Sequence, residues 1–159
     1  MKLSKTLIVA AVVAASSVAG SAFAQAEQFF PLLSYRTGPY APNGTPWANG
    51  KQDYLKLVNA RDGGVNGVKI SFEECETAYA TDRGVECYER LKGKNGGATV
   101  FQPLSTGITF ALTEKVPGDK IPLITSGYGR SDTQDGGVFK WNFPLIGHYW
   151  VAGDTVLQH

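Results

Sequence analysis

The sequence predicts an α/β fold with a mainly parallel sheet and flanking helices. From residue 29 onward, short apolar segments alternate with segments of helical periodicity, and glycine- or proline-rich turns separate them. Strands that alternate with helices at this pace form βαβ units, in which the strands run parallel. Residues 25–159 are predicted to form one lobe of this kind. A helix that starts near Tyr149 still continues at His159, so we expect the fold to be incomplete.

Residues 1–24 have the pattern of a cleavable signal peptide. Lys2 and Lys5 precede an uncharged apolar run, and small residues occupy the first and third positions of Ala22-Phe23-Ala24. The run is short and rich in alanine and serine for a membrane span, which needs about 20 apolar residues. An uncleaved anchor is the alternative. We expect export to the periplasm and a mature chain that begins at Gln25.

The net charge of the chain limits the classes of partner that are expected. The formal net charge is +1, it becomes −1 without Lys2 and Lys5, and no basic run follows. Nucleic acid is therefore not an expected partner.

Cys75 and Cys87 are predicted to form a disulfide in an oxidising compartment, with two free thiols as the alternative. Their spacing does not fit a CxxC motif, and without neighbouring histidines they cannot close a zinc site.

Apolar runs and turn signals set the expected element boundaries. The first helix is expected to begin at a Thr45 cap with proline at its first position, and to end at Gly63. Glu73, Glu74 and Glu76 are expected in a solvated loop over residues 73–80. Strands are expected at residues 29–35, 68–72, 98–101, 121–125 and 138–143, and further helices at residues 81–92, at residues 105–115 and from about residue 149.

The loops at the carboxyl ends of the strands are the expected binding region, because ligands of parallel sheets bind at that edge. Ser105 and Thr106 offer hydroxyls where a helix begins, and the free N–H groups there favour a carboxylate. Both residues could equally act as ordinary helix caps.

A second loop and two aromatic residues complete the predicted pocket. Ser126, Gly127 and Tyr128 add a hydroxyl, close backbone approach and an aromatic face. Tyr40 and Trp47 could supply an apolar wall, although Trp47 also lies on the helix face expected to pack into the core. We interpret this set as a pocket for a small carboxylate whose remaining part is uncharged or aromatic.

Enzyme signatures are missing from the sequence. It contains no GxSxG elbow, Walker loop or HExxH motif. The two histidines, His148 and His159, both lie near the end of the chain, away from the candidate nucleophiles. We therefore expect no catalytic residues, no metal site and no cofactor.

Two stretches carry a family resemblance. Residues 34–44 read SYRTGPYAPNG, and residues 59–67 read NARDGGVNG and lead directly into a strand. This pattern resembles the start of type I periplasmic binding proteins, the group of the leucine/isoleucine/valine-binding proteins. The resemblance covers nearly all of residues 29–159.

The resemblance implies a two-lobed Venus-flytrap protein, of which this chain is the N-terminal lobe. It implies capture of a small solute, such as a branched-chain amino acid, an amide or an aromatic acid, for the membrane permease of an ABC importer. A family serine at a strand-to-helix junction holds the solute carboxylate, and Ser105 or Thr106 matches it. Family contacts also fall on residues 126–129 and near Tyr40 and Trp47. The alternative is a ligand-sensing protein of the same fold, and in either case we expect a monomer.

Overall fold

A computed structural model describes residues 27–126 and 130–159, so the predicted signal peptide, Gly127 and Tyr128 lie outside the described residues. Strands and helices alternate over the first two thirds of this range, as predicted. The elements are β1 (Glu27–Ser34), α2 (Ala41–Asp62), β2 (Lys69–Glu76), α3 (Thr81–Leu91), α4 (Thr106–Thr113), α5 (Val116–Asp119), β3 (Leu123–Thr125), β4 (Asn142–Pro144) and α6 (Tyr149–Leu157), with 3₁₀ turns at Lys94–Gly96 and Ser131–Gln134.

All pairings between these strands are parallel, which confirms the predicted fold class. β1 pairs with β2 from Glu27–Lys69 to Ser34–Glu76, and β3 pairs with β4. Single bridges join Phe29 to Ala98 and Phe101 to Leu123. Residues 98–101 therefore connect the two pairs, although they form isolated bridges rather than the continuous strand that was predicted. The resulting order is β2, β1, residues 98–101, β3 and β4.

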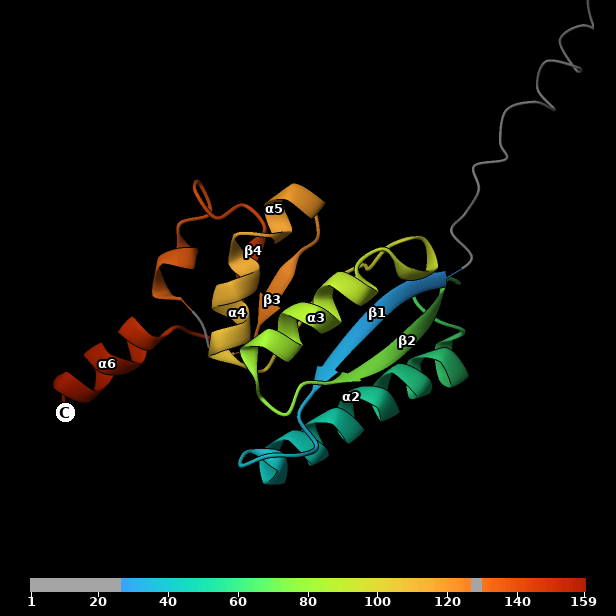
Figure 1. Ribbon diagram of the computed structural model, residues 1–159, viewed down its shortest axis with the longest axis horizontal. Helices are drawn as coiled ribbons and strands as arrows, with labels where there is room; N and C mark the ends of the chain where they lie inside the picture. Colours follow the sequence, from blue (N-terminus) through green and yellow to red (C-terminus); the bar gives the residue numbers. More distant parts are fainter. Residues whose placement is uncertain (1–26, 127–129) are drawn as a thin grey trace, which may run out of the picture.

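Helices lie on both sides of the β1–β2 pair (Figure 1). α2 covers one side, and α3 covers the other side next to α4, whereas α6 projects away from the sheet. The main core lies between the sheet and the α3–α4 pair. Its fully buried members include Tyr88, Phe101 and Leu112, and the rings of Tyr88 and Phe101 are 4.6 Å apart. The helix predicted at residues 81–92 thus forms as α3 and packs into this core through Tyr88.

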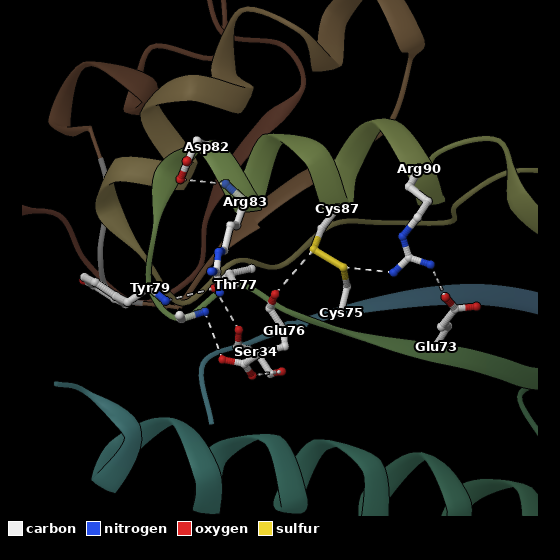
Figure 2. Close-up of a disulfide and its surroundings, with 11 residues drawn as sticks. Ser34, Glu73, Cys75, Glu76, Thr77, Tyr79, Asp82, Arg83, Cys87 and Arg90 are labelled. Atoms are coloured by element: carbon white, nitrogen blue, oxygen red, sulfur yellow. Dashed lines mark hydrogen bonds and ion pairs between the residues drawn. A yellow bond between two sulfur atoms is a disulfide. The ribbon is translucent and has the colours of Figure 1, made fainter. Parts of the chain in front are cut away.

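The disulfide prediction is confirmed, and the bond ties β2 to α3. Cys75 lies in β2 and Cys87 in α3 (Figure 2). Outside the disulfide, Arg90 donates hydrogen bonds to the Cys75 sulfur and to Glu73. The covalent link and the polar contacts therefore hold α3 against the second half of β2.

α2 begins earlier than predicted, at Ala41, and Thr45 is not its cap. Pro42 lies in the first turn, where a missing N–H costs nothing, and Asn43 and Gly44 donate to the Tyr40 carbonyl. The predicted helix start at Thr45-Pro46 is wrong, because Pro46 lies inside the helix. The predicted end is confirmed, since Gly63 adopts a left-handed conformation with φ 70°.

β2 extends four residues beyond its predicted end, so the prediction of a solvated acidic loop at residues 73–76 is wrong. Glu73, Glu74 and Glu76 pair in register with Pro31, Leu32 and Ser34 of β1. Strand pairing joins this stretch to β1 on one side, and each carboxylate has a donor from another part of the chain. These long-range partners explain why acidic residues, which are poor strand formers, remain in the sheet.

The predicted strand at residues 138–143 is also wrong in its position. Val138 and Phe139 lie in a turn in which both donate to the Asp135 carbonyl, and Val138 is 70% exposed. The strand is the shorter β4, whose Asn142 is buried and hydrogen-bonded to Thr113. The helix predicted at residues 105–115 forms as α4, which ends at Thr113, and the short α5 follows it.

Candidate functional site

A hollow of about 450 Å³ lies at the edge where the carboxyl ends of β1 and β2 meet. Its lining comes from the segments that follow these two strands, from the start of α2, from the segment before α4 and from the start of α6. The lining residues are Tyr35, Tyr40, Asn43, Tyr79, Leu104 and Tyr149. This is the edge at which the sequence predicts a binding region.

Three of the tyrosines form a connected aromatic cluster. The Tyr79 ring meets the Tyr35 ring edge-on at a centroid distance of 5.0 Å, and it lies 4.4 Å from the Tyr40 ring in a tilted arrangement. Both arrangements fall within the favourable range for aromatic pairs. Tyr35 is buried, whereas Tyr40 is half exposed. The cluster therefore presents one wall that is anchored in the fold at Tyr35 and open to solvent at Tyr40.

Close packing of α2 fixes the position of Tyr35. Gly44 is buried in the first part of α2, and a Cβ atom at this position would lie 2.1 Å from the Tyr35 backbone oxygen. Only glycine leaves room for this approach. The helix can therefore lie directly against Tyr35 and carry Asn43 to the hollow.

Another part of the lining joins α4 to α6. The Tyr149 hydroxyl, in the first turn of α6, is hydrogen-bonded to Thr106 Oγ1 at 2.6 Å. Leu104 precedes α4 and adds an apolar surface. Thr106, one of the predicted site residues, therefore holds one of the lining tyrosines.

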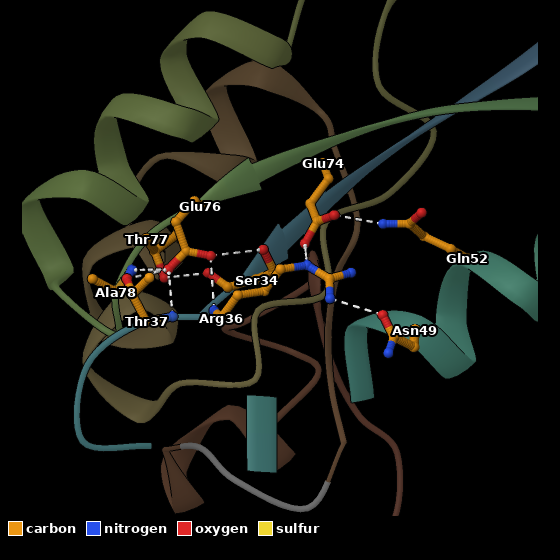
Figure 3. Close-up of polar contacts among 9 residues, drawn as sticks. All are labelled: Ser34, Arg36, Thr37, Asn49, Gln52, Glu74, Glu76, Thr77 and Ala78. Atoms are coloured by element: carbon orange, nitrogen blue, oxygen red, sulfur yellow. Dashed lines mark hydrogen bonds and ion pairs between the residues drawn. The ribbon is translucent and has the colours of Figure 1, made fainter. Parts of the chain in front are cut away.

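At the end of β2, the Glu76 carboxylate accepts hydrogen bonds from two loops (Figure 3). The backbone N–H groups of Arg36 and Ala78 donate to its carboxylate at 2.8 and 2.9 Å. Burial raises the pKa of Glu76, but these bonds and those from Thr37 outweigh it, and the pKa is lowered. Glu76 is therefore an ionised acceptor at neutral pH.

Glu74 connects the same strand end to α2. It is paired with the Arg36 guanidinium and accepts a hydrogen bond from Gln52, while Arg36 also donates to Asn49 at 2.8 Å. Burial raises the pKa of Glu74, but the hydrogen bond from Arg36 and further polar contacts leave it lowered. The loop after β1 is therefore tied both to β2 and to α2.

Ser105 is a buried helix cap. Its hydroxyl accepts a hydrogen bond from the Ile108 N–H at 3.4 Å, which is the contact expected of a residue that caps a helix. Its neighbours Leu104 and Thr106 border the hollow or hold its wall. Ser105 therefore positions the start of α4 beside the site.

The other predicted residues are divided between the hollow and its surroundings. Tyr40 lines the hollow, but Trp47 lines a different one of about 300 Å³, together with Pro46 and Tyr54. Ser126 accepts a hydrogen bond from the Gln102 side chain at 2.8 Å. The structure thus brings Tyr40 and Thr106 to one place and separates Trp47 from them.

Tyr35, Asn43, Tyr79, Leu104 and Tyr149 were missed by sequence reasoning. Tyr35 and Leu104 follow segments that end at the binding edge, so their position in the chain was an available signal. Tyr79 lay in the segment interpreted as a solvated loop, and Tyr149 was assigned only to the final helix. Nothing local in the sequence indicated that these rings converge.

The hollow is suited to holding a small molecule. Aromatic walls offer apolar contact, and phenol and amide groups offer hydrogen bonds that orient a ligand. Among the described residues, no group of three or more histidine, cysteine, aspartate or glutamate side chains is arranged to hold a metal ion. None of the helices in residues 27–126 and 130–159 combines the length and apolarity that a membrane crossing requires.

Comparison with known families gives a match over most of the chain. The family described as periplasmic binding protein matches residues 27–159. The Leu/Ile/Val-binding protein BraC3 of Rhizobium johnstonii is 26% identical over 110 residues, which are 69% of this chain and 29% of BraC3.

Two crystal structures extend the comparison to the fold. One, described as an ABC transporter permease from the Pseudomonas fluorescens group, is 44% identical, with a TM-score of 0.77 over 84% of this chain and 32% of that protein. The other, a solute-binding protein of an ABC transporter from R. palustris in complex with benzoate, is 25% identical, with a TM-score of 0.50 over 62% of this chain and 27% of that protein. The chain thus spans a third or less of the length of these relatives.

Proposed function

The chain belongs to the periplasmic binding protein family, in the group of leucine/isoleucine/valine-binding proteins, and from this premise we propose that it captures a small solute for an ABC importer. The solute is a carboxylate or amide, such as a branched-chain amino acid, an amide or an aromatic acid. Capture takes place in the periplasm, the solute is handed to a membrane permease, and no reaction is catalysed.

The observation that carries this proposal is the tyrosine-lined hollow at the carboxyl edge of β1 and β2. Its walls match the apolar part of such a solute, since aromatic rings accept both aliphatic and planar groups. The Asn43 amide and the phenol groups supply polar partners. BraC3 is named for Leu/Ile/Val binding, and the R. palustris protein holds benzoate, so both relatives support a small carboxylate.

The acidic end of the solute is assigned to the start of α4. The first backbone N–H groups of a helix and its dipole favour a negative charge. Ser105 caps this helix and Thr106 lies at its first position, next to Tyr149. In the proposed complex the carboxylate meets the Thr106 side of the hollow, while the apolar part of the solute contacts Tyr79 and Tyr40. A second lobe completes the enclosure.

The proposal is tested by calorimetry on the full-length protein with leucine, benzoate and a small amide as probes. Tyr79→Ala is expected to weaken binding at least tenfold, a change of about 1.4 kcal/mol, because Tyr79 contacts both neighbouring rings. Tyr54→Ala is the matched control, since Tyr54 lies on α2 away from this hollow and is 62% exposed.

Two results would count against the proposal in different ways. Wild-type protein that binds none of the probes would contradict capture of these solute classes. Binding that survives Tyr79→Ala and Tyr54→Ala equally well would place the site elsewhere in the protein.

A further inference from the structure

Glu76 is the last residue of β2, and it receives hydrogen bonds from the segments that follow both β1 and β2. From the β1 side, Arg36 N donates to Oε2 at 2.8 Å, while Thr37 donates to Oε1 through its N–H at 3.3 Å and its hydroxyl at 3.0 Å. From the β2 side, Ala78 N donates to Oε1 at 2.9 Å. The Ser34 hydroxyl adds a fifth contact at 3.2 Å. Figure 3 shows these groups converging on one carboxylate.

The segment on the β2 side has an unusual backbone that needs such support. Ala78 and Tyr79 are both non-glycine residues in the left-handed region, with φ of 50° and 64°. Such conformations cost free energy and persist only where surrounding contacts over-determine them. Glu76 holds the Ala78 N–H, and the Thr77 hydroxyl accepts from the Tyr79 N–H while donating to the Ser34 carbonyl. Figure 2 shows the same segment beside the disulfide.

This segment decides where the Tyr79 ring points. The ring lies between Tyr35 and Tyr40, and Tyr35 directly precedes the two residues that donate to Glu76 from the β1 side. The β1–β2 pairing ends at Ser34–Glu76, so no further ladder bonds hold the two segments together. Beyond that pair, the Glu76 carboxylate and the Thr77–Ser34 contacts join the two segments, together with the contact between the Tyr35 and Tyr79 rings.

We propose that Glu76 is a positioning residue for solute binding, which acts by holding both segments so that Tyr35, Tyr40 and Tyr79 form one wall of the hollow. The inference rests on the proposed function, because it assigns the solute to that hollow. A carboxylate is needed because every partner is a donor, and a glutamine would turn an NH₂ group toward N–H groups. Glu76 does not line the hollow itself, so its effect passes through the tyrosines.

The test compares Glu76→Gln with Glu73→Gln in the full-length protein. Glu73 lies in the same strand but pairs with Arg90 and Lys94, on the disulfide side. Glu76→Gln is expected to speed hydrogen exchange at the Arg36, Thr37 and Ala78 amides at least tenfold and to reduce the near-ultraviolet circular dichroism of the tyrosines. It should also weaken solute binding about tenfold, with leucine and benzoate as probes. Glu73→Gln should change none of these three quantities.

The outcomes separate the positioning role from the proposed function. Unchanged exchange and dichroism in Glu76→Gln would overturn the positioning role whether or not a solute binds. Altered exchange with unaltered affinity would overturn it as well. Wild-type protein that binds neither probe would instead overturn the proposed function. If Glu76→Gln does not fold, Thr37→Val is used in its place. This variant removes a single hydroxyl donor to Glu76, so a smaller rise in hydrogen exchange is expected.

Discussion

Gly44→Ala would show whether the close approach of α2 to Tyr35 is as tight as the structure indicates. An added Cβ atom would lie 2.1 Å from the Tyr35 backbone oxygen and 2.2 Å from Cδ2 of its ring, whereas real Cβ contacts essentially never fall below 3.0 Å. The oxygen belongs to the main chain directly after β1 and cannot rotate away as a flexible side chain would. Either α2 moves outward or Tyr35 is displaced from its contact with Tyr79.

Two opposing terms set the size of the effect. Alanine is favoured over glycine inside a helix by about 1 kcal/mol. Forcing extra atoms into a packed site costs about 1–3 kcal/mol, and a clash with main chain belongs at the upper end of that range. The net expectation is a loss of about 2 kcal/mol in the free energy of unfolding.

The control for this prediction lies in the same helix. Gly50 is exposed, and a Cβ atom there would meet nothing within 4 Å. Gly50→Ala should therefore raise the free energy of unfolding by about 1 kcal/mol, the helix-propensity term alone. Urea unfolding of both variants gives the comparison. If Gly44→Ala stabilised the protein as much as Gly50→Ala, the packing argument for Tyr35 and α2 would be refuted.

Two further predictions concern the disulfide and a partly buried lysine. Replacing Cys75 and Cys87 together by serine should lower the free energy of unfolding by about 3 kcal/mol, the chain-entropy value for a loop of this size. Urea unfolding with and without reductant checks it, and an unchanged midpoint would contradict it. Burial lowers the pKa of Lys51 to about 8, below the unfolded value of about 10.4, so the folded state disfavours the charged form. Lys51→Met should stabilise the protein at pH 7 by about 1 kcal/mol after allowance for solvent screening. Wild-type stability rises from pH 8 to pH 10.4 as Lys51 deprotonates, so this advantage should fade, and an advantage that stays constant with pH would contradict the reasoning.

Much of the fold could be predicted because its signals are local. The apolar run that forms β1, the buried face of α3 and the glycine that ends α2 can each be recognised from a few neighbouring residues. The end of β2 could not, because the strand identity of Glu73–Glu76 depends on β1 and on Arg36 and Arg90, which are far away in the sequence. Local propensity favoured a loop, and tertiary pairing overrode it.

The place of the candidate site could be predicted, but most of its residues could not. Parallel topology alone directs attention to the carboxyl ends of the strands. Small polar residues in those loops were natural candidates, and Ser105 and Thr106 do lie beside the hollow. Tyr79 reaches the hollow because Ala78 and Tyr79 adopt left-handed backbone conformations that neither residue type signals in a sequence.

The hollow depends on residues that do not line it. Its walls come from separate segments, and each wall is positioned by a different kind of contact with residues that do not line the hollow. Gly44 lets α2 approach Tyr35, Glu76 holds the segment that carries Tyr79, and Thr106 binds the hydroxyl of Tyr149. Substitutions limited to the lining tyrosines would therefore reveal ring contacts with the solute but not the supports that set the shape of the site. A relative that kept the tyrosines and lost these three supports should bind the same solute class more weakly, because its rings would no longer be pre-organised.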